Sequence, residues 1–451
     1  MSSKVQFSSK IGLVAATVGS AIGLGNVWRF PAETQANGGA AFLLLYIACV
    51  LLLGIPVMLA EFSVGRAGRS DAIGSFRRLS PGKPWWLLGA LAVLASYLIT
   101  VFYMVVEGWT LEYLWEGLFG SLYDFSGTPG ATEAVFDSRM EALTHTPLKP
   151  ALFTAAVILI NTGVLLGGVQ KGIERLSNVL MPLLFVILLI LCVVSLTLPG
   201  AGEGLRFFLE PDFSKLSPDV FVNALGQAFF SLSLGMGILI TYASYYPATT
   251  RLPRTALIVS LLSLLVAVLM GMIIFPAVKT FGLDRNILEG ATLVFVTLPE
   301  VFSRLPFPQL WSTLFFALLL VAALTSTVSL SEVAVATLQD RLGWSRRRAV
   351  LSALLPLLVL SGLCALSFST FSGCTVDGYN FFGLLDNITT NYMLPFVAIG
   401  TSLYVGWCMP AFRDELSNYG SMRSHVTGVT RLILRFLAPA LILLIFIYRF
   451  I

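Results

Sequence analysis

Charged residues are scarce in this chain: Asp, Glu, Lys and Arg make up 12% of its 451 residues, whereas 57% are hydrophobic. A soluble domain of this length needs a larger polar surface, so the composition excludes a water-soluble globular protein. Only two histidines occur, and the five cysteines are scattered, without metal-ligand spacing or a disulfide framework. A net charge of +4 gives no indication of a nucleic-acid partner.

Apolar runs recur along the whole length, and the mean hydropathy is +0.86. A bilayer core of roughly 30 Å requires about 20 apolar helical residues. By that measure the sequence predicts an all-α polytopic membrane protein with eleven spans. Their approximate limits are 9–34, 40–68, 85–118, 150–168, 176–198, 220–246, 255–281, 308–340, 347–369, 380–411 and 430–449. The third and eighth spans are longer than a bilayer requires, so we expect them to be strongly tilted.

The placement of basic residues predicts the orientation. If the N-terminus is cytoplasmic, the inner segments hold 19 of the 28 Lys and Arg residues, including the run Arg346–Arg348. The outer loops are acidic, as at Glu133, Asp137 and Glu141. The positive-inside rule therefore predicts a cytoplasmic N-terminus, and an odd number of spans leaves the C-terminus outside the cell.

Two spans carry glycines and small polar residues at mid-depth, where an ordinary span would have Leu, Ile or Val. The stretches are Gly19–Asn26 in the first span and Ser231–Gly237 in the sixth. Glycine costs about 1 kcal/mol per helix position relative to alanine, and unsatisfied backbone in hydrocarbon costs several kcal/mol per group. Close helix packing is one interpretation. Interruption of both helices around a polar cavity is the other.

The positions of the two stretches favour interruption. Each lies in the first span of a set of five, the arrangement of an inverted-repeat transporter whose site is at the bilayer midplane. We therefore predict one transmembrane domain made of a first repeat (1–198), a second repeat (199–415) and an appended last helix (416–451). Half-helix N-termini would attract a carboxylate, and freed carbonyls would coordinate a cation.

The same segments closely resemble the neurotransmitter:sodium symporter family, particularly its eleven-span bacterial amino-acid transporters. The matching stretches are GSAIGLGNVWRFP followed by NGGAAF, FFSLSLGMGILITYASY in the sixth span and ALTSTVSLSEV in the eighth. Similar segments extend to about residue 420. The resemblance implies a five-plus-five inverted repeat, with the first and sixth helices broken, and alternating access driven by a sodium gradient.

The resemblance also implies two sodium sites. The first would use Ala21, Asn26, Ser231 and Ser263, where Ser263 replaces the usual asparagine of the seventh span. The second would use the carbonyls of Gly19, Ile22 and Ala322 with the hydroxyls of Thr325 and Ser326. Oxygen ligands suit a hard cation. Without the resemblance, hydrogen bonds from Thr325 and Ser326 to carbonyls of their own helix would be the simpler interpretation.

A substrate pocket follows from the same alignment. Its residues would be Ala21, Gly25, Ile99, Tyr103, Phe230, Ser231, Ser233, Met236, Ser326 and Leu330. Tyr103 resembles the family's carboxylate donor, and Phe230 its aromatic lid. No ionisable side chain lines the half that would receive the substrate side chain, and a charged group there would stay unpaired at high cost. We therefore expect a neutral, hydrophobic or aromatic L-amino acid.

Gate residues are implied on both sides of this pocket. Arg29 and Asp386 match the family's extracellular pair. On the inner side Lys4 replaces the usual arginine, Asp340 matches its partner, and Tyr245 would brace the pair. Lysine lacks the bidentate fork of arginine, which leaves Lys10 as another candidate.

Three carboxylates at membrane depth, Glu61, Glu107 and Glu332, are functional hypotheses by default. For Glu61 we favour a structural role as an acceptor for the backbone of a broken helix. Tyr46, Gln227, Ser231 and Ser263 match positions around the family's chloride site, while Ala267 stands where chloride-independent members commonly have a carboxylate. Either chloride binds there, or another acid such as Glu332 supplies the negative charge.

The sequence thus predicts a sodium-coupled symporter in the cytoplasmic (inner) membrane, with two sodium ions per cycle and chloride left open. A proton-coupled carrier, and a sensor or channel that does not transport stoichiometrically, remain alternatives. An intramembrane enzyme is the weakest alternative, because the sequence shows no membrane-buried metal motif, Ser/Lys dyad or paired Asp. A homodimer through the last spans is open.

Overall fold

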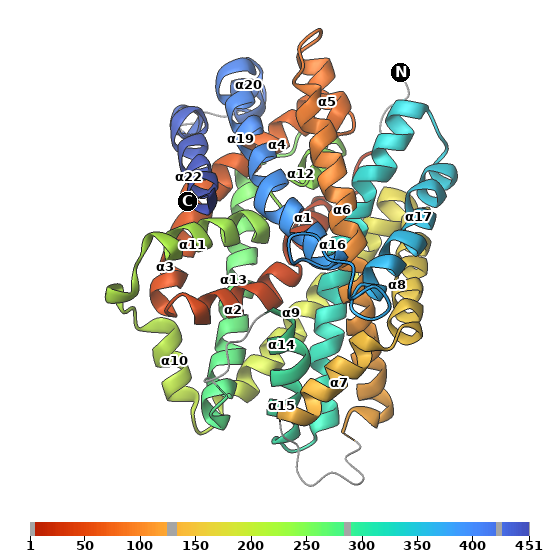
Figure 1. Cartoon of the computed structure of the whole chain (residues 1–451). Coiled ribbons are helices and arrows are strands. Elements are labelled where there is room, and N and C mark those ends of the chain that lie inside the picture. The colour runs from red at the N-terminus through yellow and green to blue at the C-terminus, as the bar shows by residue number, and fades with distance from the viewer. Residues whose placement is uncertain (1–4, 124–132, 284–289, 421–425, 451) are drawn as a thin grey trace.

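The computed structural model describes residues 5–123, 133–283, 290–420 and 426–450. These residues form helices, and their β-type pairing is confined to one isolated bridge between Val376 and Tyr379. The all-α prediction is therefore confirmed. Figure 1 shows the helices as a bundle with α5 (Ala72–Leu79) and α20 (Phe412–Leu416) at one end and α7 (Glu133–His145), α10 (Ala201–Leu209) and α15 (Leu298–Ser303) at the other.

The first half of the chain supplies a long central helix, α6, and the first interrupted span. Its elements, in which η marks short π or 3₁₀ segments, are α1 (Lys10–Ala21), η1 (Gly25–Arg29), α2 (Phe30–Ala36), α3 (Ala40–Cys49), η2 (Val50–Gly54), α4 (Ile55–Gly68), α5 (Ala72–Leu79), α6 (Trp86–Phe119), η3 (Ser121–Tyr123), α7 (Glu133–His145), α8 (Leu148–Leu166), η4 (Val169–Glu174) and α9 (Arg175–Leu196).

The second half repeats this pattern with a second interrupted span and a second long helix, α16. Its elements are α10 (Ala201–Leu209), η5 (Phe213–Lys215), α11 (Pro218–Ser231), α12 (Ile238–Ser244), α13 (Leu252–Phe281), α14 (Gly290–Thr292), η6 (Leu293–Thr297), α15 (Leu298–Ser303), α16 (Pro308–Leu342), α17 (Arg346–Leu366), α18 (Phe381–Asp386), η7 (Asn387–Met393), α19 (Leu394–Leu403), η8 (Tyr404–Cys408), α20 (Phe412–Leu416), α21 (Val426–Leu432), η9 (Ile433–Leu437) and α22 (Ala438–Phe450).

Eight helical stretches of the described residues are long and apolar enough to cross a membrane, and the bent pair α1/η1–α2 makes a ninth. The predicted spans 220–246 and 380–411 are each built from shorter pieces, α11 with α12 and α18 through η8. The total of eleven stays a prediction for this reason. The two long spans are confirmed: α6 and α16 have 34 and 35 residues, about 51 Å at 1.5 Å per residue, and pack against each other.

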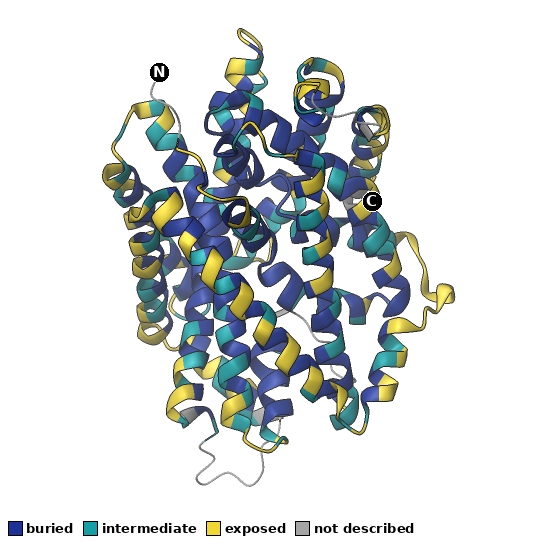
Figure 2. Ribbon diagram, turned by 180° about the vertical axis from the view of Figure 1, so that it is seen from behind, coloured by how far each residue is buried: buried dark blue, intermediate teal, exposed yellow. Residues whose placement is uncertain are grey.

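Exposed residues follow the outer helices of the bundle (Figure 2), and many of them are large hydrophobic residues. On α9 the exposed side chains include Leu183, Val186 and Val193, and on α13 they include Leu257 and Leu261. These residues recur at spacings of three and four, so each helix presents one apolar stripe outward. An apolar surface of this extent suits contact with lipid and not with water.

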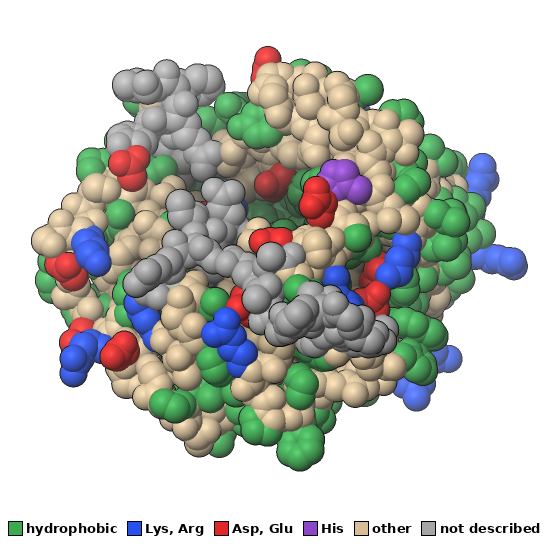
Figure 3. All heavy atoms as spheres, turned by 60° about the horizontal axis from the view of Figure 1, so that its bottom comes forward, with side chains coloured by type: hydrophobic (Ala, Val, Ile, Leu, Met, Phe, Trp, Pro, Cys, Tyr) green, Lys and Arg blue, Asp and Glu red, His purple; other side chains and the backbone are tan. Residues whose placement is uncertain are grey.

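Charged side chains lie at both ends of the bundle. Figure 3 shows the end that carries α7, α10 and α15, with acidic side chains near the middle and Lys and Arg mostly toward the rim. At the opposite end Arg66 of α4 is buried and forms an ion pair with Glu415 of α20, and it donates a 3.1 Å hydrogen bond to Asn418. Arg66 is one of the 19 basic residues that the predicted orientation places on the cytoplasmic side. Its side chain does not face water, because it is buried and pairs with Glu415, which joins α20 to α4.

The buried Arg66–Glu415 pair gives the first prediction. Arg66→Gln leaves the Glu415 carboxylate buried without its counter-charge, which costs about 3–5 kcal/mol. The unfolding temperature of the detergent-purified protein should therefore fall markedly. Arg206→Gln is the matched control, because the side chains of Arg206 and its partner Glu210 are 73% and 71% exposed, and exposed pairs contribute less than about 1 kcal/mol. Equal small shifts for both variants would contradict the structural role of Arg66.

Candidate functional site

The first interrupted span breaks after Ala21. Ile22 leaves the helical region with φ −88° and ψ 87°, and the helical axis turns by 51° before the chain continues as η1 and α2. Glycines allow the turn because neighbours lie close on both sides: a Cβ added to Gly23 would meet Ser326 Oγ, and one added to Gly25 would lie 2.7 Å from the Phe230 ring. The predicted interruption is confirmed.

The second interrupted span breaks between α11 and α12, over residues 232–237. Ser233, Gly235 and Gly237 all have positive φ, at 53°, 80° and 72°. A Cβ on Gly235 would lie 2.5 Å from the Leu394 carbonyl oxygen. Glycine is thus required at 235 for both conformation and space. The second predicted interruption is confirmed as well.

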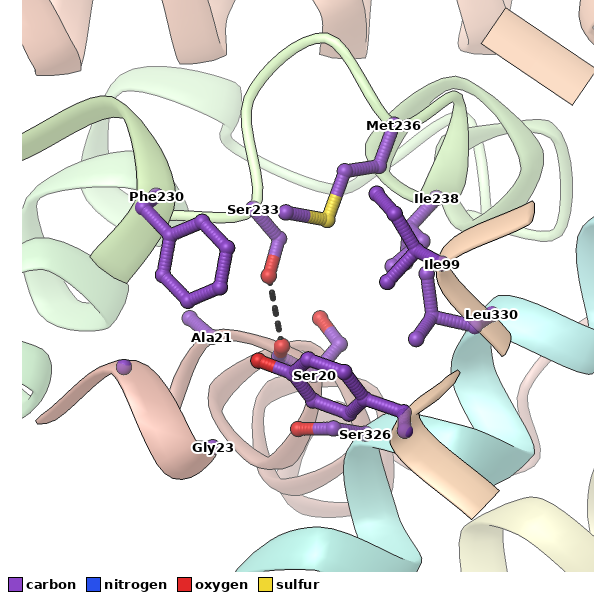
Figure 4. Close-up of a pocket in the computed structure, with 12 residues that line it drawn as sticks. Ser20, Ala21, Gly23, Ile99, Phe230, Ser233, Met236, Ile238, Ser326 and Leu330 are labelled. Atoms are coloured by element: carbon purple, nitrogen blue, oxygen red, sulfur yellow. Dashed lines mark hydrogen bonds between the residues drawn. The ribbon is translucent and has the colours of Figure 1, made fainter. Parts of the chain in front are cut away.

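Side chains from other helices satisfy the backbone that the two breaks expose. Glu61 Oε1 of α4 accepts a 2.7 Å hydrogen bond from the Gly235 N–H, and Gln227 Nε2 donates to the Gly25 carbonyl at 2.8 Å. Ser233 Oγ donates to the Ser20 carbonyl at 2.7 Å, which links one break directly to the other (Figure 4). Glu61 therefore has the acceptor role that we expected from the sequence.

A cavity of about 290 Å³ lies between the two breaks, α6 and α16. It is lined by Ser20, Ala21, Gly23, Gly25, Ile99, Tyr103, Phe230, Ser233, Met236, Ile238, Ser326 and Leu330. Nine of the ten residues predicted to form a substrate pocket are in this lining; Ser231 is the exception. Ser20, Gly23 and Ile238 are additional. The first two belong to the small-residue stretch that marks the break, whereas no sequence signal distinguishes Ile238.

The cavity has an apolar and a polar side. Figure 4 shows Met236, Ile238, Ile99 and Leu330 converging on one side, and Ser20, Gly23 and Ser326 on the other. Neither Asp, Glu, Lys nor Arg is among the residues that line it. A ligand in this space therefore meets aliphatic side chains at one end and hydroxyl or backbone groups at the other.

Phe230 closes the cavity on one side. Its ring centroid lies 6.4 Å from that of Tyr103, and the Arg29 guanidinium lies 5.0 Å above it on the far face. Beyond Phe230 is a second cavity of about 410 Å³, whose walls include Arg29, Phe230, Thr390 and Leu394. One aromatic ring thus separates the two spaces.

The predicted outer gate pair is not in contact in this structure. Arg29 Nε lies 3.4 Å from Glu33 Oε1 on the same helical stretch, and Asp386 Oδ1 accepts a 2.9 Å hydrogen bond from Thr390. Within the described part of the chain no ion pair joins Arg29 to Asp386. The two side chains nonetheless lie near the same closure, because Arg29 and Thr390, the partner of Asp386, both line the cavity beyond Phe230.

The residues of the first predicted sodium site are brought together. Asn26 Nδ2 lies 3.2 Å from the Ala21 carbonyl and 2.9 Å from Ser263 Oγ, and Ser263 Oγ donates to the Ser231 carbonyl at 3.2 Å. Asn26 Oδ1 is buried and has no hydrogen-bond partner among the described residues. A buried amide oxygen without a donor is a suitable ligand for a small cation.

At the second predicted site the two hydroxyls differ. Thr325 Oγ1 donates within its own helix, to the Val321 and Ala322 carbonyls at 3.1 Å each. Ser326 Oγ is buried and, in the described chain, unpartnered. Thr325 also faces α1, because a Cβ on Gly19 would lie 3.2 Å from the Thr325 Cβ. The α1 break and α16 therefore meet here, with Ser326 as the available oxygen.

Residues proposed to surround a chloride ion also lie close together in the structure. Tyr46 donates a 2.9 Å hydrogen bond to Ser231 Oγ, next to Ser263, and Ala267 is buried. Glu332 is elsewhere: it pairs with Arg346 at 2.6 Å and accepts a 2.7 Å hydrogen bond from the Tyr245 hydroxyl. Glu332 therefore already has an arginine as its counter-charge, and its role in compensating charge at this group stays a prediction.

The remaining predicted residues lie outside the central cavity. Lys4 falls outside the described residues, so the inner Lys4–Asp340 pair stays a prediction; Asp340 Oδ2 accepts the Asp71 N–H at 2.6 Å. Glu107 is buried beside Asn161, whose Nδ2 lies 3.3 Å from both carboxylate oxygens. Glu107 is absent from the cavity lining.

Comparisons with known proteins agree with this geometry. A family model described as "Sodium:neurotransmitter symporter family" matches residues 4–124 and 145–451. A sodium-dependent transporter of Bacillus subtilis, YhdH, is 38% identical over 98% of this chain and 97% of its own length. A sodium-dependent transporter of Haemophilus influenzae is 35% identical, over 98% and 97%. The crystal structure of MhsT in complex with L-phenylalanine superposes with a TM-score of 0.90 at 41% identity, over 98% and 99% of the two chains.

The second break gives a prediction about stability. Gly235→Ala places a side chain in a left-handed conformation, at about 1–2 kcal/mol, and against the Leu394 carbonyl. The unfolding temperature should fall. Gly163→Ala on α8 is the control, because nothing lies within 4 Å of its added Cβ and alanine favours a helix by about 1 kcal/mol. If Gly235→Ala were as stable as Gly163→Ala, the requirement for glycine at the break would be refuted.

Proposed function

The chain belongs to the sodium:neurotransmitter symporter family, and from that premise we propose that it is a sodium-coupled symporter for neutral, hydrophobic or aromatic L-amino acids. It is a sodium-dependent, multi-pass membrane transporter. Substrate and ions would occupy the space between the two breaks. Alternating access would expose that space first to one side of the cytoplasmic membrane and then to the other.

The observation that carries the proposal is the two-sided cavity at the breaks. The polar side, with Ser20, Gly23 and Ser326, suits the carboxylate and amine that all amino acids share. The apolar side, with Ile99, Met236 and Leu330, suits an uncharged side chain. A charged side chain would lose its hydration there without gaining a partner. MhsT, whose crystal structure holds L-phenylalanine, supports an aromatic or large aliphatic substrate.

We propose that sodium enters as a co-transported ion at two places beside this cavity. Asn26 Oδ1 with the Ala21 carbonyl would serve one ion, and Ser326 Oγ with carbonyls of the α1 break would serve the other. Both assignments draw support from the buried oxygens that lack a partner in the described chain. Ser263 would contribute a hydroxyl oxygen in place of the amide oxygen of the asparagine that the family resemblance implies, so the number of oxygen ligands of the first ion is unchanged.

Phe230 and Tyr103 would form the closure nearest the substrate, with Arg29 and Asp386 above it. In this arrangement Arg29 binds the Phe230 ring and Glu33, so pairing with Asp386 would require the arginine to exchange partners. Surface ion pairs contribute only about 0–1 kcal/mol. Such an exchange therefore costs little, as a gate that opens in every cycle requires.

Uptake into proteoliposomes tests the function. Labelled leucine, tryptophan, glycine and glutamate would be offered with external sodium, potassium or an acid gradient, each with and without chloride. We expect sodium-dependent uptake of leucine or tryptophan that does not require an acid gradient, and no uptake of glutamate. Dependence on chloride would assign the Tyr46 group to an anion. Proton-driven uptake would refute the sodium sites, and binding without uptake would indicate a sensor.

The unpartnered hydroxyl of Ser326 gives a further prediction. Ser326→Ala removes one oxygen ligand, and loss of a contact to a charged group weakens binding by roughly tenfold or more. The sodium concentration for half-maximal uptake should rise by that factor. Ser361→Ala is the matched control, because Ser361 Oγ on α17 is also buried without a partner in the described chain. An unchanged sodium requirement in Ser326→Ala would remove Ser326 from the ion site.

A further inference from the structure

A groove, distinct from the two cavities on either side of Phe230, lies on the side of the bundle between α1, α9 and α13. Its volume is about 740 Å³, toward the upper end of the 300–1,000 Å³ that is typical of small-molecule pockets. It is separate from the cavity at the breaks, because the two share no lining residue. The size and position call for a long, partly apolar occupant.

One end of this groove is strongly basic. Lys10 is the first residue of α1, and Arg251 and Arg254 flank the start of α13. All three residues are exposed. Among the described residues, none of them forms an ion pair within 4 Å with an acidic side chain. Glu174, which lies near the start of α1, is engaged by Ser8 and Ser9. The basic end therefore carries uncompensated positive charge.

Most of the remaining residues that line the groove are apolar. Val14 of α1, Phe185 of α9 and Leu262 of α13 line it deeper along the same helices. Leu262 is eight residues beyond Arg254, which corresponds to about 12 Å of helix. On the same helices Leu183 and Leu257 are 44% and 45% exposed on the surface that faces lipid. The groove is thus open to the bilayer and has its cationic end at the start of the helices.

We propose that this groove binds one anionic phospholipid, with its phosphate at Arg251 and Arg254 and an acyl chain along α1 and α13. Uncompensated Lys and Arg residues next to a bilayer attract anionic headgroups by about 1 kcal/mol each. A zwitterionic lipid has no net negative charge for the three cations. A peptide or second copy of the chain would have to displace lipid from the apolar walls and supply acidic groups as well.

Lipid retention tests the proposal. The protein would be purified in detergent, incubated with equal amounts of phosphatidylglycerol and phosphatidylcholine, and analysed for bound lipid by native mass spectrometry. We expect retention of about one phosphatidylglycerol per chain in preference to phosphatidylcholine. The double variant Arg251→Gln/Arg254→Gln should reduce that preference by roughly tenfold or more. Arg347→Gln/Arg348→Gln on α17 removes the same charge at exposed positions outside the groove and should leave the preference unchanged.

A second variant separates the acyl part from the headgroup. Ala15→Phe narrows the apolar wall without changing charge and should lower retention of phosphatidylglycerol, while the unfolding temperature in detergent reports whether the variant is folded. Inorganic phosphate at millimolar concentration should not displace the lipid. Equal retention of both lipids, the same result for both double variants, or full displacement by phosphate would each overturn the proposal. Sodium-driven uptake is not part of the readout, so the result is independent of the transport assignment.

Discussion

The central constraint on this molecule is that backbone amides and carbonyls inside a bilayer have no water to bind. Two helices are broken at mid-depth, and each broken turn exposes groups that would cost several kcal/mol if left alone. The hydrogen bonds from Gly235 to Glu61, from Gln227 to Gly25 and from Ser233 to Ser20 answer this requirement. Ser20, Gly23 and Gly25 of the first break also line the cavity, where a ligand with polar ends can bind.

Buried charged side chains are likewise paired with a nearby side chain of opposite charge. Arg66 pairs with Glu415, and Arg346 with Glu332. The first pair joins α4 to α20, which are distant in sequence, and the second joins the consecutive helices α16 and α17. Around the central cavity, by contrast, the lining contains oxygen atoms and apolar groups but no ionised side chain. Charges that bind the structure together and uncharged oxygens that would bind an ion are therefore kept in different places.

The sequence predicted the breaks, because glycines and serines at mid-depth leave a chemical signature, and the family resemblance implied most of the residues that line the cavity. It did not anticipate the partner of Glu332, which pairs with Arg346 of the next helix. Successive residues of a helix turn by about 100°, so Glu332 points about 200° away from Leu330, which lines the cavity. Hydropathy indicates how deep a residue lies in the bilayer. The direction in which its side chain points around the helix depends on how the neighbouring helices pack. Ile238 was missed for a related reason, since the loop 232–237 decides where α12 begins.

The position of Phe230 has a kinetic consequence. Its ring is a wall of the inner cavity and of the outer one at once, and the Arg29 guanidinium holds it from one face. Such a cation–π contact amounts to about 0.5–2 kcal/mol. If this contact were the only restraint, the ring would stand aside for between a few per cent and a few tens of per cent of the time. The passage between the two spaces would then open in frequent, brief movements of one side chain. Lasting closure of the inner space would require a slower movement of whole helices.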